Sequence, residues 1–226
     1  MPSFMNRARR AARVGVLVGF AGLTIASAAS AATFTFDTDP FAGTSVRTTP
    51  GRQVIGGEFF ISFDTATDVF ALDRTAFGLT GDPQFVNAAA QNVPADHVNV
   101  VVLESLDDDN NALTPFGAGN AANLIAAQIT SPGPGFFVYF NQGLDLPRLV
   151  FSSDLSDNTA DLRILFRMLN LTGATGRNAL PTFTASNFAF VGDAPAVPEP
   201  AMLLMMGTGL VGVSWRVRRR DRGRVA

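Results

Sequence analysis

Alternation of apolar and polar residues predicts a series of short strands through the middle of the chain. Residues 136–140 (Phe-Phe-Val-Tyr-Phe) are apolar at every position, which predicts a central strand covered on both faces. In 161–169 the alternation predicts that Arg163 and Arg167 lie on one side of a strand. The other runs of this kind are 33–37, 58–64, 98–103, 148–152 and 188–190.

Two stretches between these runs lack the strand pattern. Residues 84–92 and 117–128 are rich in Ala and Asn, and the second predicts a short surface helix at 120–128. Turn signals such as Thr49-Pro-Gly51 and Ser131-Pro-Gly-Pro-Gly135 separate the strands. The chain shows no helix–strand alternation and no repeat. We therefore expect an all-β fold over 32–193, an antiparallel β-sandwich of which a jelly roll is one form.

The first 31 residues have the order of a secretory signal peptide. Four arginines precede an apolar run at 14–25, and small residues follow it. Two Ala-x-Ala triplets place the cleavage after Ala28 or after Ala31. The apolar run is shorter than the roughly 20 residues that span a bilayer, which favours a cleaved signal over the alternative of an uncleaved anchor.

Residues 194–226 have three parts. Val197-Pro198-Glu199-Pro200 comes first, residues 201–215 carry no charge, and the end at 216–226 is rich in arginine. The uncharged stretch predicts a transmembrane helix whose arginine-rich end stays in the cytoplasm by the positive-inside rule. The acidic middle of the chain would then lie outside.

These parts, in this order, resemble the PEP-CTERM sorting domain, with Val197, Pro198, Glu199 and Pro200 matching its motif. The resemblance implies recognition by an exosortase, a membrane-bound protease of Gram-negative bacteria, which removes the tail. It also implies a setting of exopolysaccharide and biofilm formation. Residues 136–173 look like a segment found in exported PEP-CTERM proteins of undefined function.

Charge is distributed unevenly along the chain. All 17 basic residues are arginines, and between 32 and 196 there are 7 of them against 17 acids, a net charge of −10. Binding of nucleic acid needs clustered basic residues to neutralise phosphates, so this acidic centre argues against it. The basic ends are typical of charges that flank a membrane segment.

Candidate chemistry is sparse. The absence of cysteine excludes thiolate chemistry, and His97 is the single histidine, without a Gly-x-Ser-x-Gly motif to make a nucleophile elbow. We expect no catalytic and no cofactor-binding residue. Asp107, Asp109 and Asn111 have the spacing of half a calcium loop, but Ala112 and Ala118 exclude an EF-hand. A looser Ca²⁺ site stays open there, and a solvated acidic turn is the favoured alternative.

The expected function is that of a non-catalytic structural or adhesive component associated with exopolysaccharide and biofilm. Its precursor would be tethered in the inner membrane, and the mature protein would lie at the cell surface or in the extracellular matrix. Expected partners are signal peptidase and exosortase during processing, the membrane, and exopolysaccharide. Two alternatives stay open: a secreted carbohydrate-active enzyme or carbohydrate-binding module, and a permanently membrane-anchored periplasmic protein.

Overall fold

A computed structural model describes residues 30–111 and 113–193. Residues 1–29 of the predicted signal peptide at 1–31 and the whole predicted tail at 194–226 lie outside the described residues. Within them are ten strands, three α-helices and four short 3₁₀ helices. The strands are β1 (Thr33–Phe36), β2 (Val54–Ile55), β3 (Phe59–Ile61), β4 (Val69–Asp73), β5 (Phe85–Ala88), β6 (Val100–Leu103), β7 (Gly135–Asn141), β8 (Leu146–Ser152), β9 (Leu162–Met168) and β10 (Phe188–Val191). The α-helices are α1 (Arg74–Phe77), α2 (Ala118–Ala126) and α3 (Gly173–Ala179); the 3₁₀ helices are η1 (Val46–Thr48), η2 (Ala90–Asn92), η3 (Leu180–Thr182) and η4 (Ala185–Asn187).

Seven strands form the larger sheet. Its order is β2-β9-β8-β7-β6-β5, and β3 pairs with β9 beyond the end of β2. The strand predicted at 136–140 is β7, and it lies inside the sheet between β8 and β6. Every residue of β7 from Gly135 to Phe140 is buried. The prediction of a central strand covered on both faces is therefore confirmed.

Three strands form the smaller sheet, in the order β1-β4-β10. Both outer strands run parallel to β4: Phe34 and Phe188 are each paired with Phe70. The first and the last strand of the described chain thus flank one strand from its interior. This sheet cannot form until both ends of the domain have been synthesised.

The expectation of an antiparallel sandwich, including a jelly roll, is wrong. Only the pairs β7–β8 and β8–β9 are antiparallel, and all other strand pairs of the described residues are parallel. Period-two alternation locates strands, but it carries no information on their relative direction. What the structure retains of the prediction is the class: a mostly β chain with few helices and two sheets packed on one another.

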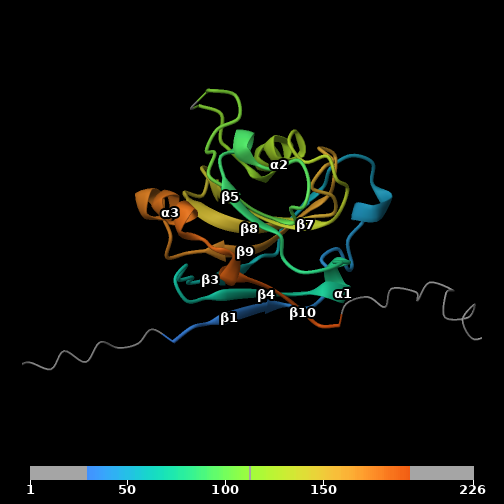
Figure 1. Cartoon of the computed structure of the whole chain (residues 1–226). Helices are drawn as coiled ribbons and strands as arrows, with labels where there is room; N and C mark the ends of the chain where they lie inside the picture. The colour runs from blue at the N-terminus through green and yellow to red at the C-terminus, as the bar shows by residue number, and fades with distance from the viewer. Residues whose placement is uncertain (1–29, 112, 194–226) are drawn as a thin grey trace, which may run out of the picture.

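The larger sheet lies between α2 and the smaller sheet (Figure 1). Side chains on both of its faces are buried. Phenylalanines fill the layer between the two sheets, where Phe63 and Phe70 stack with ring centroids 4.3 Å apart. On the opposite face Val101, Phe137 and Tyr139 pack under α2. The high Phe content of the sequence therefore serves the core, because aromatic rings bury a large apolar area per residue.

The Ala/Asn-rich stretches differ from each other in structure. The predicted helix at 120–128 is confirmed as α2, but its Ala121 and Ile125 are fully buried, so it is a core-covering helix. Because it connects the parallel strands β6 and β7, it forms the crossover of a βαβ unit. The other stretch, predicted to contain no strand, carries β5 at the edge of the sheet.

A β-bulge in β9 overturns the prediction that Arg163 and Arg167 share one side. Leu149 pairs with Phe166 and Val150 with Ile164, so Leu165 has no partner of its own. Ile164 packs toward α2, whereas both Leu165 and Phe166 pack toward the smaller sheet. The extra residue resets the alternation, and the two arginines point to opposite faces.

Among the described residues, no helix combines the length and the apolar character required to cross a membrane.

Candidate functional site

A charged cluster lies on the face of the larger sheet that α2 partly covers. Arg148 on β8 is directly opposite Arg167 on β9, and an Nη2 atom of each lies 2.5 Å from Glu58 Oε1. Glu58 precedes β3, and its side chain is only 7% exposed. One carboxylate therefore holds together two guanidinium groups that would otherwise repel each other across neighbouring strands.

Burial opposes ionisation of Glu58, but its own backbone N–H and the two arginines outweigh this effect and lower its pKa to about 2. Glu58 is therefore ionised at any physiological pH. A glycosidase requires a carboxylic acid that is still protonated at the working pH, so this glutamate is unsuited to that role.

Aromatic side chains flank this cluster. Phe60 on β3 is 62% exposed, and its ring covers the guanidinium of Arg167 at 4.9 Å. On the inner side lies the buried Tyr139, whose hydroxyl accepts a hydrogen bond of 2.9 Å from Asn141 Nδ2. Burial raises the pKa of the Tyr139 hydroxyl, so it stays neutral.

Exposed apolar side chains gather along the same edge of the sheet. We define the β3 edge surface as Phe60, Arg167, Glu58 and Arg148 together with Val54 and Leu169. Val54 is 50% exposed and Leu169 is 51% exposed. The neighbouring Phe59 is 56% exposed, but its ring packs on Phe36 and Phe166 toward the smaller sheet. Large apolar groups exposed beside charged groups are typical of binding surfaces. This is the strongest candidate site that the described residues offer.

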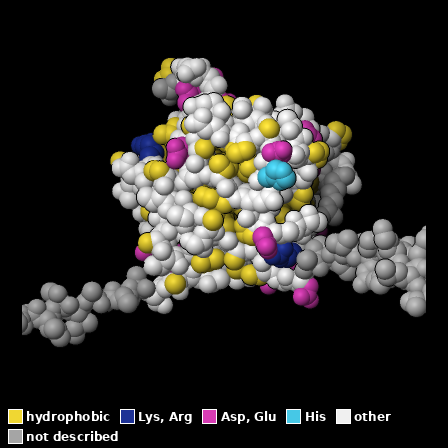
Figure 2. Space-filling view, viewed as in Figure 1, with side chains coloured by type: hydrophobic (Ala, Val, Ile, Leu, Met, Phe, Trp, Pro, Cys, Tyr) yellow, Lys and Arg dark blue, Asp and Glu magenta, His cyan; other side chains and the backbone are white. Residues whose placement is uncertain are grey.

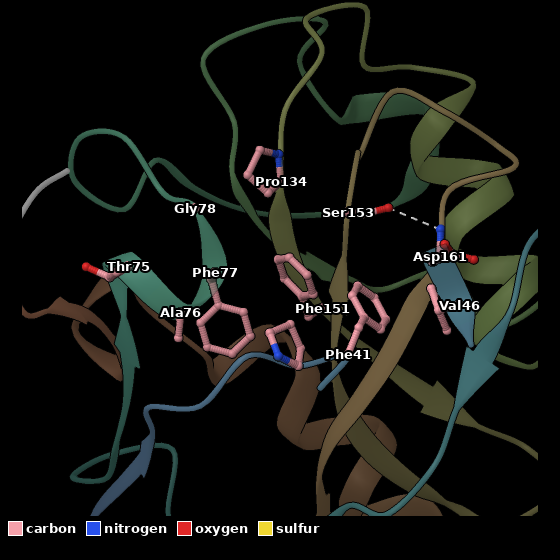
Figure 3. A pocket seen from close by; sticks show the side chains of 11 residues that line it. Phe41, Val46, Thr75, Ala76, Phe77, Gly78, Pro134, Phe151, Ser153 and Asp161 are labelled. Atoms are coloured by element: carbon pink, nitrogen blue, oxygen red, sulfur yellow. Dashed lines mark hydrogen bonds between the residues drawn. The ribbon is translucent and has the colours of Figure 1, made fainter. Parts of the chain in front are cut away.

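A pocket of about 350 Å³ lies at the other end of β8 (Figure 3). Phe41, Phe77 and Phe151 form its apolar wall. At its rim the backbone N–H of Asp161 donates to Ser153 Oγ at 3.1 Å, and the Asp161 carboxylate accepts from the backbone of Gln53. These two polar groups therefore serve to hold loops.

The predicted calcium residues lie in a loop that projects beyond α2 (Figure 1), and this projection carries acidic side chains in Figure 2. Asp107, Asp108 and Asp109 each offer an oxygen, and these atoms lie within 4.8 Å of one another. The Asn111 oxygen accepts from the backbone of Leu113, and Asp109 accepts from the backbone of Asn111. The three adjacent carboxylates are exposed, and calcium binding by this loop stays a prediction.

His97 is 84% exposed at the surface (Figure 2), and its backbone adopts a left-handed conformation with φ 56°. It borders a pocket of about 280 Å³ together with Asn99 and Ser131. Its Nε2 atom lies 4.0 Å from Asp96. A histidine that acts as a base is held by a hydrogen-bonded orienting group, and His97 makes no such bond within the described residues.

Most of the predicted processing residues lie outside the described residues, namely Ala28 and the motif Val197, Pro198, Glu199 and Pro200. Ala31 is described and is exposed just before β1.

The sequence analysis did not single out the β3 edge surface. Its residues come from four strands, β2, β3, β8 and β9, and from the positions just before β3 and just after β9. Neither spacing nor a motif connects Glu58 with Arg148 and Arg167. A signal was nevertheless present: Glu58 is one of only two glutamates between 32 and 193, and it directly precedes two adjacent phenylalanines. Only the pairing of β3 with β9 brings these groups together.

Comparison with known proteins identifies one motif, which lies near the C-terminal end of the chain. No curated protein and no solved structure matches the sequence. The PEP-CTERM protein-sorting motif matches residues 196–220, which is the region that the sequence analysis assigned to the sorting tail. The chain therefore carries a PEP-CTERM sorting motif and is an exported protein sorted at the membrane by an exosortase-dependent route.

Proposed function

We propose that the β domain is a non-catalytic structural or adhesive component of the cell surface or extracellular matrix, and that it contacts exopolysaccharide through the β3 edge surface. The sorting motif supports the setting, since it marks the chain as exported and sorted at the membrane. The observation that supports the proposed contact is the exposed Phe60 ring, which lies beside paired charged groups.

The chemistry of this surface suits a sugar chain. The outer face of an aromatic ring packs against the C–H face of a sugar, and guanidinium and carboxylate groups hydrogen-bond to hydroxyls. Arg167 lies behind Phe60 and Glu58 fixes Arg167, so the ring rests on a positioned support. A surface that is ordered before binding loses little conformational entropy on association.

Exopolysaccharide purified from the producing bacterium is the probe. The exported protein should co-sediment with it, and Phe60→Ala should weaken binding at least fivefold. Leu113→Ala is the matched control, because Leu113 is 91% exposed on the projecting loop and outside the proposed surface. Equal binding by both variants would contradict the proposed contact, and release of new reducing ends from the polysaccharide would contradict the non-catalytic role.

A further inference from the structure

Ala32, the residue that precedes β1, is hydrogen-bonded to a buried carboxylate. The backbone nitrogen of Ala32 lies 2.8 Å from Asp68 Oδ1, and the Ala32 carbonyl accepts from the backbone of Val69 at 2.9 Å. Asp68 is only 5% exposed. The preceding residues Ser30 and Ala31 are exposed and make no hydrogen bond to the described residues. The fold thus holds the chain from Ala32 onward.

In the described part of the chain, the Asp68 carboxylate accepts hydrogen bonds but has no cationic partner. Its carboxylate accepts from the backbone of Asp64 at 2.9 Å and from Thr67 Oγ1 at 3.2 Å, in addition to Ala32. Within the described residues no arginine or histidine forms an ion pair with it. A buried charge without an opposite charge is costly, so a cation at the Ala32 nitrogen would stabilise the fold.

We propose that the Ala31–Ala32 peptide bond is the signal-processing site and that the α-ammonium group freed on Ala32 forms an ion pair with the buried carboxylate of Asp68. The inference rests on the export of the chain. It selects between the two Ala-x-Ala triplets, because cleavage after Ala28 would leave the Ala32 nitrogen as an uncharged amide.

The reaction is a hydrolysis by signal peptidase with water as the co-reactant. The C–N bond between Ala31 and Ala32 breaks, and the water oxygen bonds to the Ala31 carbonyl carbon. The signal peptide is released with a C-terminal carboxylate on Ala31. The Ala32 nitrogen takes up the protons and is an ammonium group at neutral pH. Processing therefore places a positive charge where the fold already holds a donor within hydrogen-bond distance of Asp68.

The sequence allows a direct test, because the chain has no lysine. The α-amino group is the sole primary amine of the processed protein, so an amine-reactive acetylating reagent reports on that group alone. The exported full chain is purified from its host, its first residue is read by N-terminal sequencing, and its acetylation rate is measured in buffer and in urea. We expect Ala32 as the first residue and acetylation at least tenfold slower in the folded protein.

Two variants connect the protection to Asp68. Asp68→Asn should abolish most of the tenfold protection, whereas Asp64→Asn should not, because the Asp64 carboxylate bonds to the backbone of Ala66 in the same turn. If Asp68→Asn does not fold, Ala31→Leu serves in its place. It blocks the second triplet and leaves the first, so the exported chain should begin at Ala29, lose the protection and unfold at a lower temperature.

The outcomes separate this inference from the proposal of export. A wild-type exported protein that begins at Ala29, or one whose folded and unfolded forms react equally fast, overturns the Ala32–Asp68 pair while export stands. A chain that keeps Met1 and stays in the cell overturns both.

Discussion

Arg148 and Arg167 face each other directly across β8 and β9, and Glu58 Oε1 lies 2.5 Å from both guanidinium groups. Two like charges in opposed positions destabilise a sheet, and here Glu58, the residue before β3, supplies the carboxylate that compensates them. The cluster connects β3 to the centre of the larger sheet. It also supports Phe60, the residue on which the proposed contact depends.

Replacing Glu58 by Gln should therefore destabilise the domain. The substitution keeps the shape but leaves two mostly buried guanidinium groups without a counter-charge, at a cost of about 3 kcal/mol. Urea unfolding measures this loss of unfolding free energy. Asp82→Asn is the control. The Asp82 side chain is exposed where it pairs with Arg74, so loss of this ion pair should cost about 1 kcal/mol or less. Equal losses in the two variants would show that Glu58 has no special role.

The pH dependence of stability follows from the same residue. The pKa of Glu58 is about 2 in the folded protein and 4.5 as its ordinary value, so the folded state holds fewer protons between these limits. This stabilisation is fully present above about pH 4.5 and is lost as the pH falls toward 2. Urea unfolding at pH 6 and pH 3 should show a smaller decrease for Glu58→Gln than for the wild type. The same decrease in both proteins would contradict the assignment.

Aromatic packing predicts contrasting effects for two phenylalanines ten residues apart. Phe70 is fully buried and stacks on Phe63, so Phe70→Ala should cost about 3–5 kcal/mol of unfolding free energy. Phe60 is 62% exposed, so Phe60→Ala should cost less than about 1 kcal/mol. Thermal unfolding of the two variants tests this difference, and a large loss for Phe60→Ala would make it a core residue and not a contact residue.

Two helical glycines should respond to alanine with opposite signs. A Cβ on Gly176 in α3 would lie 2.9 Å from Phe140 Cε2 and closer still to the Leu171 carbonyl oxygen, so Gly176→Ala should destabilise the domain by about 1–3 kcal/mol. A Cβ on Gly119 in α2 meets nothing nearer than Arg52 Nη1 at 3.7 Å. Gly119→Ala should therefore stabilise the domain by up to about 1 kcal/mol. Shifts of the same sign in both variants would contradict this packing.

Local patterns predicted most strands but not their directions. The run at 136–140 gave the central strand, because apolar residues at every position need two covered faces. Parallel pairing could not be predicted, because the residues of a strand do not determine the direction of its neighbour. β5 was missed because its residues, Phe-Val-Asn-Ala, lie within an Ala/Asn-rich stretch and are only partly buried.

The candidate surface needed the tertiary structure for a different reason. Glu58, Arg148 and Arg167 are separated by up to 109 residues, and the bulge at Leu165 determines which face Arg167 occupies. A bulge breaks the period-two rule without a glycine or proline to mark it. The sorting tail was readable for the opposite reason: all its parts are contiguous in the sequence, and the motif match at 196–220 confirms it.

The central claim is that the tail serves to sort an exported domain. The most direct test is the intact mass and cell fraction of the protein from its native host, with and without its exosortase. The account predicts an extracellular species that lacks residues beyond the 197–200 motif in the wild type, and a membrane-bound species that keeps its tail in the strain without exosortase. A tail-bearing, membrane-bound species in both strains would contradict it and would support the permanently anchored alternative.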